Sequence, residues 1–165
     1  MKPRLFIGSS KENHKIALAA QQNLRGFADV TVWNQGVFRL SKTALDSLLD
    51  GLDRFDFGVF VFAADDLAEI RAEVCKVPRD NVVFELGLFI GRLGPQRRFV
   101  IVPEREKGFH LLSDLLGFKV ATYNPRAKEA TFQAKLPTFR TTDFHFLRIS
   151  ACRQVSDRSP WPTGQ

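Results

Sequence analysis

Short apolar runs alternate along the first 125 residues with segments in which apolar side chains recur every three or four positions. The runs have the length and residue types of β-strands and lie at 4–8, 30–33, 57–63, 98–102 and 118–122. Helical spacing marks the segments 12–26, 45–52 and 81–93. The run at 57–63 has no polar side chain, which is typical of a central strand covered on both faces. This order predicts an α/β fold in which the strands of a five-stranded parallel sheet alternate with helices on both faces.

The apolar pattern fades after Tyr123. We therefore expect one folded domain at residues 1–124 and an appendage at 125–165, partly disordered or linking to a sensor domain absent from this chain. From Arg126 onward, seven Lys and Arg stand against three Asp and Glu, so this appendage carries +4 of the formal net charge of +6. Because the rest of the chain is nearly balanced, the charge indicates no specific nucleic-acid binding.

The sequence shows no pattern typical of a membrane-spanning segment or of a metal site. No apolar stretch approaches the roughly 20 residues that span a bilayer, and the N-terminal segment is not apolar enough for a signal peptide, so we expect no membrane association and a cytoplasmic protein. Cys75 and Cys152 lie far apart, and the three histidines are scattered. Metal and redox motifs need clustered ligands, so we expect no metal site and two reduced thiols.

The ends of the predicted strands locate a candidate crevice. In open parallel sheets, ligands bind beyond the carboxyl ends of the strands, where the strand order reverses. A flavodoxin-like order puts this reversal between the first and third strands, so Gly8, Ser9 and Ser10 would face the loop after Ala63. The two serine hydroxyls can bind a ribose or a phosphate.

Trp33 and Asn34 end the second predicted strand, at the same edge of the sheet. The indole can stack on a base or on a nicotinamide ring, although an isolated tryptophan more often serves packing. We include both residues among the candidate ligand contacts.

Glu85 interrupts the apolar stripe of the helix expected at 81–93. It shares the helix face of Val82 and Phe89, at spacings of three and four residues. A capping box does not explain it, because with Asp80 as N-cap the third helical residue is Val83. A carboxylate beside a buried stripe costs free energy unless it is paired or functional. Its pattern leaves two alternatives equally open: a functional carboxylate, or a salt bridge to Arg79 or Arg92.

The segment Pro78–Asn81 puts a cation, an anion and an amide just before this helix. Free N–H groups at a helix N-terminus favour a phosphate or a carboxylate, which makes Arg79 and Asp80 candidate nucleotide ligands. Helix capping by Asp80 or Asn81 is the simpler interpretation of those two residues.

Four segments resemble the bacterial TIR-like domains of cyclic-nucleotide-triggered antiphage effectors: RLFIGSS (4–10), VTVWNQGVF (30–38), LDRFDFGVFVF (52–62) and PRDNVVFELGLFIGRLG (78–94). The resemblance extends over residues 4–123. It implies a flavodoxin-like TIR fold and hydrolysis of NAD⁺ to nicotinamide and ADP-ribose or a cyclised product, with NAD⁺ as substrate and no cofactor. The glutamate of the last segment, Glu85, would be catalytic, and the nucleotide pocket would include Phe6, Gly8, Ser9, Arg79 and Asp80.

The implied chemistry suits a single carboxylate. Nicotinamide leaves as a neutral base and the ribose becomes oxocarbenium-like, so a carboxylate can stabilise the cation or hold the ribose hydroxyls. No general acid is required, and Asp65 and Asp66 are possible helpers.

The resemblance also implies a separate cyclic-nucleotide sensor, as a further domain or a partner chain, and activation by self-association into dimers or filaments. This chain has no room for the sensor, so it is part of a longer effector, a stand-alone member or a divergent protein. Two other functions stay open: a non-catalytic TIR scaffold for protein–protein contacts, and a nucleoside-processing transferase.

Overall fold

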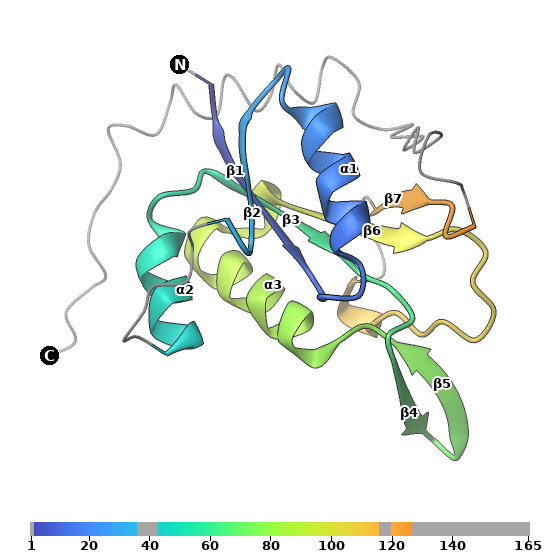
Figure 1. Cartoon of the computed structure of the whole chain (residues 1–165). Helices are drawn as coiled ribbons and strands as arrows, with labels where there is room; N and C mark the ends of the chain where they lie inside the picture. The colour runs from blue at the N-terminus through green and yellow to red at the C-terminus, as the bar shows by residue number, and fades with distance from the viewer. Residues whose placement is uncertain (1, 36–42, 116–119, 127–165) are drawn as a thin grey trace, which may run out of the picture.

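Five parallel strands form the central sheet of the computed structural model, which describes residues 2–35, 43–115 and 120–126 (Figure 1). The strands follow the spatial order β2-β1-β3-β6-β7, which is the flavodoxin-like order, and all pair in parallel. Their bounds are β1 Arg4–Ser9, β2 Asp29–Val32, β3 Phe57–Val61, β6 Arg98–Pro103 and β7 Val120–Tyr123. The predicted fold class is confirmed, although residues 118 and 119 of the fifth predicted strand lie outside the described part.

In the described part of the chain, three α-helices cover the sheet, one on one face and two on the other (Figure 1). They are α1 His14–Leu24, α2 Ala44–Leu52 and α3 Asp80–Leu93. Thr43 caps the start of α2, because its hydroxyl accepts a hydrogen bond from the Asp46 N–H. Gly94, with a φ of 81°, follows the last residue of α3 and ends the helix.

Alternate side chains of the central strands enter two separate cores. Leu5 and Ile7 of β1 pack beneath α1, whereas Phe6 between them points to the opposite face, beneath α3. Strand β3 repeats the pattern, because Val59 and Val61 share the first core and Phe60 lies in the second. The continuous apolar run of β3 is therefore explained by burial on both faces.

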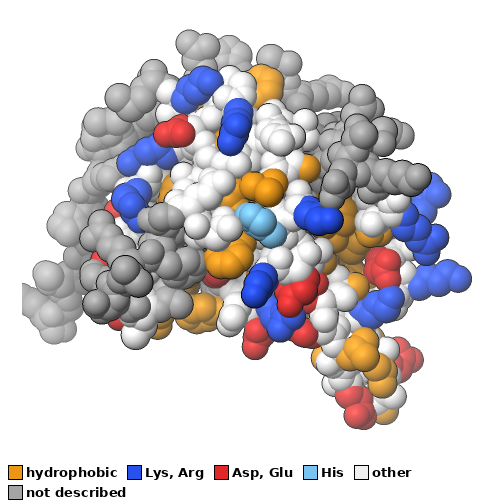
Figure 2. Space-filling model, in the orientation of Figure 1, with side chains coloured by type: hydrophobic (Ala, Val, Ile, Leu, Met, Phe, Trp, Pro, Cys, Tyr) orange, Lys and Arg blue, Asp and Glu red, His pale blue; other side chains and the backbone are white. Residues whose placement is uncertain are grey.

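An antiparallel hairpin that the apolar pattern does not predict separates β3 from α3. Its strands β4 Asp66–Ile70 and β5 Glu73–Val77 form a second, two-stranded sheet that projects from the body (Figure 1). Leu67 and Val74 are 71% and 72% exposed, and Figure 2 shows hydrophobic and acidic side chains side by side on this projection. Its half-exposed side chains explain why the sequence lacks a buried-strand signal here.

Strands and helices do not alternate strictly, which corrects the expectation from the sequence. The hairpin is one exception, and 3-10 turns are the other: η1 covers Pro95–Arg97 and η2 covers Ser113–Leu115. Between β6 and β7, the described residues contain η2 and no α-helix. The charged segment 104–107 has no apolar side chains to form a buried helical stripe.

The predicted crevice lies where β1 and β3 end together. Ser9 pairs in register with Val61, so the loops after both strands leave the same edge of the sheet. Asn13 joins these loops, because its Nδ2 donates hydrogen bonds to Ser10 Oγ (2.8 Å) and to Asp65 Oδ1. In the described ranges, no helix is long and apolar enough to cross a membrane. The predicted appendage falls almost wholly outside those ranges, since nothing after residue 126 is described.

Candidate active site

A cavity of about 430 Å³ opens at this edge of the sheet. It lies between the loop after β1, the end of β2 and the helices α2 and α3. Its volume falls within the usual range of small-molecule sites, roughly 300–1,000 Å³. The lining residues are Ser9, Ser10, Lys11, Glu12, Trp33, Leu45, Leu48, Arg79, Asn81, Val82, Phe84 and Glu85.

Glu85 reaches the cavity from the second turn of α3, beside the buried Val82. Its Oε2 is buried and has no hydrogen-bond partner among the described residues. Burial raises the pKa of the Glu85 carboxyl from 4.5 to about 7. A carboxyl group at the wall of a cavity with a pKa raised this far is typical of a functional site.

The alternative of a salt bridge to Glu85 does not hold, because both candidate cations are engaged elsewhere. Arg79 Nη2 lies 3.2 Å from Glu12 Oε1, and its Nε lies 3.2 Å from Asp66 Oδ2. Arg92 forms an ion pair with Asp53.

Gly8 provides the space that the Glu85 carboxylate occupies. A Cβ atom on Gly8 would lie 2.8 Å from Glu85 Oε2 and 2.9 Å from Cδ1 of Phe60. Real Cβ atoms essentially never approach other heavy atoms this closely. Gly8 thus contributes no side chain to the cavity wall, but it lets the carboxylate lie against the end of β1.

Trp33 and Ser9 are linked at the cavity wall, as the predicted crevice requires. The indole Nε1 donates to Ser9 Oγ at 3.1 Å, which fixes the ring orientation. The neighbouring Asn34 does not line the cavity: its Nδ2 lies 3.3 Å from Nε2 of His14, whose ring meets Trp33 edge to face at 6.4 Å. Asn34 therefore positions the Trp33 side of the site from outside.

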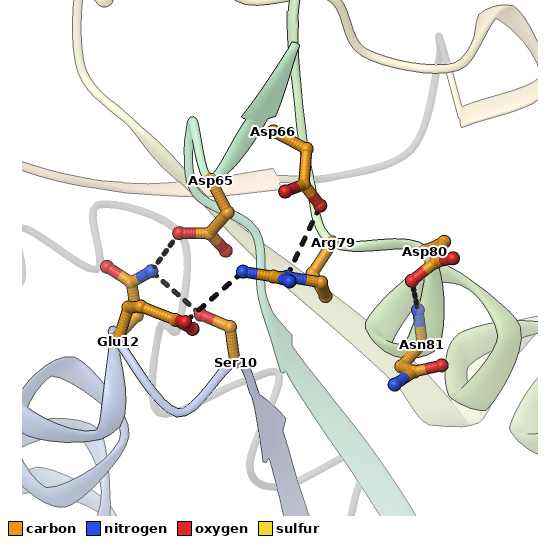
Figure 3. Close-up of polar contacts among 8 residues, drawn as sticks. Ser10, Glu12, Asp65, Asp66, Arg79, Asp80 and Asn81 are labelled. Atoms are coloured by element: carbon orange, nitrogen blue, oxygen red, sulfur yellow. Dashed lines mark hydrogen bonds and ion pairs between the residues drawn. The ribbon is translucent and has the colours of Figure 1, made fainter. Parts of the chain in front are cut away.

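Arg79 and Asp80, predicted together, have separate roles. Figure 3 shows Arg79 held between Glu12 and Asp66, at the cavity. Asp80 turns away onto its own helix, where Oδ1 accepts from the Asn81 N–H at 2.7 Å, and it does not line the cavity. Its carboxylate therefore contacts the first turn of its own helix, although Asp80 is not the N-cap that the simpler interpretation proposed.

The N-cap of α3 also differs from the expectation. Arg79 is the N-cap, one residue earlier than predicted, and it makes no side-chain capping hydrogen bond. The third helical residue becomes Val82, which is also not an acid, so a capping box still does not explain Glu85.

Phe6, predicted as a pocket residue, lies outside the cavity lining. Its side chain is 0% exposed and stacks on Phe89 with ring centroids 4.9 Å apart. The alternation of β1 places position 6 in the core beneath α3, three residues before the strand reaches the cavity at Ser9. The Phe6 side chain therefore supports α3 from the core.

The two suggested helper carboxylates do not reach the cavity. Asp65 accepts from Asn13, and Asp66 pairs with Arg79. Neither belongs to the lining.

Sequence reasoning missed seven lining residues. Lys11 and Glu12 directly follow the predicted Ser10, so the rule that ligands meet the first strand-to-helix turn could have found them. The others come from the two helices on this face, where a helical stripe does not distinguish core from cavity: Leu45, Leu48, Asn81, Val82 and Phe84.

Comparisons with known proteins agree with this architecture. Residues 4–125 match the family described as CAP12/Pycsar effector protein, TIR domain. The chain belongs to this family. The matched range ends just after β7, so the family's TIR domain corresponds to the whole described fold.

Several longer proteins resemble this TIR domain. CD-NTase-associated protein 12 from Flavobacterium daejeonense is 45% identical over 74% of this chain and 39% of its own length. Pycsar effector protein PaPycTIR from Pseudomonas aeruginosa is 42% identical over 80% of this chain and 43% of its own length. A CD-NTase-associated protein 12 from a Lachnospiraceae bacterium is 40% identical over 74% of this chain and 38% of its own length. The chain thus spans about two fifths of the length of these relatives.

The TIR domain's cavity combines three chemical features. It has a buried carboxylate oxygen with no hydrogen-bond or ion-pair partner among the described residues, a fixed indole ring, and a polar end of hydroxyl and charged groups. In the described part of the chain, no group of three or more His, Cys, Asp or Glu side chains is arranged to hold a metal ion. The arrangement suits stabilisation of a cation on a ring-bearing, partly anionic ligand.

Proposed function

We propose that this TIR domain cleaves the nicotinamide–ribose bond of NAD⁺, with Glu85 as the catalytic carboxylate. The single observation that carries the proposal is the carboxylate itself: it lies at the cavity wall, it is desolvated, and neither candidate arginine neutralises it. Such a group attracts a cation strongly, and NAD⁺ presents a cationic ring next to the bond to be broken.

The reaction needs no second carboxyl group. As the C1′–N1 bond breaks, its electron pair moves to the ring nitrogen, and nicotinamide leaves neutral. Positive charge develops on the ribose, where the Glu85 carboxylate stabilises it. Water then adds to C1′ and loses its proton, which gives ADP-ribose; attack by a ligand hydroxyl in place of water would give a cyclised product.

Burial tunes Glu85 for this role. A carboxyl with a pKa of about 7 is only partly ionised near neutral pH in the empty cavity. A bound nicotinamide cation favours the ionised form, so ligand binding and ionisation reinforce each other. The desolvation that raises the pKa also strengthens the attraction between the carboxylate and the developing ribose cation.

We further propose that the domain is part of a cytoplasmic antiphage effector. A cyclic-nucleotide sensor, on a further domain or a partner chain, would activate the effector by causing it to self-associate into dimers or filaments. The support is the family membership and the greater length of relatives named CD-NTase-associated protein and Pycsar effector protein. Activation by assembly predicts that the isolated domain turns over NAD⁺ only at high concentration.

Release of nicotinamide from NAD⁺ tests the proposal, measured at high protein concentration with a crowding agent. Wild type should release nicotinamide, and Glu85→Gln should release none while keeping its circular dichroism spectrum. Glu73→Gln, which removes an exposed carboxylate on β5, is the matched control and should behave as wild type. Chromatography of the same reaction separates linear from cyclised ADP-ribose.

The alternatives predict other outcomes. A scaffold would neither bind nor cleave NAD⁺, and Glu85→Gln would change only its stability. A nucleoside-processing transferase would cleave an N-glycosidic bond of a nucleoside while leaving NAD⁺ intact.

A further inference from the structure

Among the described residues that line the cavity, two have cationic side chains, Lys11 and Arg79, and they differ in what surrounds them. Arg79 is held by two carboxylates at once, Glu12 and Asp66, each at 3.2 Å. Lys11 is exposed and makes no ion pair with any described residue. One cation is thus already neutralised, and the other is free to meet a ligand.

The surroundings of Arg79 are net acidic. Its single positive charge faces the carboxylates of Glu12 and Asp66, and Asp80 is its neighbour in the chain (Figure 3). Three negative groups against one positive give a formal charge of −2. An anionic ligand group would be repelled there, and it would have to displace an existing partner to reach the guanidinium.

The start of α3 does not offer a better anion site. The Asn81 N–H, which points out of the first turn, already donates to the Asp80 carboxylate at 2.7 Å. Among the described lining residues, the cation that remains for the ligand's phosphate groups is Lys11, which follows directly after Ser10 in the turn between β1 and α1.

We propose that Lys11 binds the phosphate groups of the ligand, and that Arg79 is a positioning residue. Arg79 neutralises Glu12, the residue next to Lys11, and so keeps that carboxylate from pairing with the lysine. An ammonium group is a compact charge that suits a pyrophosphate, which has several equivalent oxygens. The ligand named in this inference, NAD⁺, rests on the proposed function; the anion-binding role of Lys11 does not.

Binding constants of three ligands test Lys11 without requiring turnover. NAD⁺ and ADP-ribose contain the pyrophosphate, and nicotinamide riboside lacks it. Lys11→Gln should weaken binding of NAD⁺ and ADP-ribose by about tenfold, as loss of one charge-assisted hydrogen bond implies, and should leave nicotinamide riboside unchanged. Lys11→Arg should retain most of the affinity. The control is Lys107→Gln, an exposed lysine away from the cavity, which should bind all three ligands as wild type does.

A double-variant cycle tests the indirect role of Arg79. Arg79→Gln leaves Glu12 free to pair with Lys11, so ADP-ribose binding should weaken. Adding Glu12→Gln to that variant removes the competing carboxylate and should restore affinity to near the wild-type value. A direct phosphate contact from Arg79 would instead leave the double variant as weak as Arg79→Gln alone, and would overturn this part of the inference.

Nicotinamide release and ADP-ribose binding together show whether the role of Lys11, the proposed reaction or both are wrong. Nicotinamide release by wild type, together with ADP-ribose affinity unchanged in Lys11→Gln, would overturn the role of Lys11 and leave the reaction standing. Lysine-dependent ADP-ribose binding without nicotinamide release would sustain Lys11 and overturn the reaction. Wild type that binds neither ADP-ribose nor NAD⁺ would overturn both.

Discussion

Gly8 and Glu85 fit against each other so closely that a Cβ atom on the glycine would lie 2.8 Å from Oε2 of the carboxylate. The two residues are 77 positions apart in the chain, one at the end of β1 and the other in the second turn of α3. Because β1 is fixed in the sheet between β2 and β3, this contact sets how near the carboxylate comes to the carboxyl edge, where the cavity opens. The site therefore needs glycine at position 8, because the Glu85 carboxylate occupies the space that a side chain would fill.

Gly8→Ala should damage both stability and activity. The added methyl group meets the ring of Phe60, which is 0% exposed and has no room to move, so we expect a loss of about 1–2 kcal/mol in the free energy of unfolding. It also displaces Glu85, so nicotinamide release should fall by about a hundredfold. Urea denaturation and the nicotinamide assay measure the two effects.

Gly87→Ala is the matched control, since a Cβ there meets nothing within 4 Å. Gly87 lies in α3 on an exposed position, so alanine should stabilise the protein by about 1 kcal/mol through helix propensity and leave turnover unchanged. Equal behaviour of the two alanine variants would contradict the role given to Gly8.

Glu85→Gln should stabilise the protein while it abolishes activity. The folded state raises the pKa of Glu85 from 4.5 to about 7, so the folded protein binds a proton more tightly than the unfolded chain. Stability is therefore lost as the pH rises from about 4.5 through 7, by on the order of 3 kcal/mol in total, and glutamine removes that loss. The free energy of unfolding should be higher for Glu85→Gln at pH 8 and equal to wild type at pH 4.

A second carboxylate variant isolates this effect. Glu73→Gln changes an exposed group and should follow the wild-type stability at both pH values. A Glu85→Gln variant that is less stable than wild type at pH 8 would show that the carboxylate has a stabilising partner in solution.

The rate of NAD⁺ cleavage should rise with pH up to about 7 and then level off. The ionised Glu85 carboxylate is the form that stabilises the ribose cation, and its pKa in the free protein is about 7. Below that value, kcat/KM should fall about tenfold per pH unit, because the active form becomes proportionally rarer. A flat kcat/KM between pH 5.5 and 8 would remove Glu85 ionisation from the mechanism.

The central sheet could be predicted because burial leaves a clear pattern in sequence. Each of the five strands has an apolar run, so the fold follows from periodicity. The apolar stripe of α3 singles out Glu85 but leaves a salt bridge open, and its catalytic role is implied by the family resemblance. The hairpin could not be predicted in this way. Its turn residues Arg71 and Ala72 have positive φ values of 53° and 65°, a conformation that sequence normally signals by glycine or asparagine.

The site was only half predictable, because sequence gives the edge of the sheet but not the direction of each side chain. Ser9, Ser10, Trp33 and Arg79 line the cavity as expected, whereas Phe6 points into the core three positions before the strand ends. Charge also misleads: Arg79 is a good phosphate ligand by residue type, but it is already paired with Glu12 and Asp66. Such pairing depends on loops that are distant in sequence.

The hairpin turn stores strain that substitution should relieve. A residue other than glycine or asparagine destabilises the folded state by about 1–2 kcal/mol when it adopts this left-handed conformation. Arg71→Asn with Ala72→Gly should therefore stabilise the hairpin. Hydrogen exchange of the β4 and β5 amides should slow by at least about tenfold, while Arg71→Lys, which keeps the strain, should leave it unchanged. Faster exchange in the relieved variant would contradict a left-handed turn.

Trp33 should report ligand binding directly through its fluorescence. The chain has two tryptophans, Trp33 at the cavity and Trp161 beyond the described residues, so Trp161→Phe makes Trp33 the single emitter. Stacking of a nicotinamide or adenine ring on the indole should quench the emission as NAD⁺ is added. Trp33→Phe keeps an aromatic surface but loses the hydrogen bond to Ser9. Its NAD⁺ affinity should therefore drop about fivefold, because one hydrogen bond contributes roughly 1 kcal/mol. Trp33→Ala, which also removes the aromatic surface, should lose more NAD⁺ affinity. Unchanged emission at saturating NAD⁺ would place the ligand's rings away from Trp33 and leave the indole a packing role.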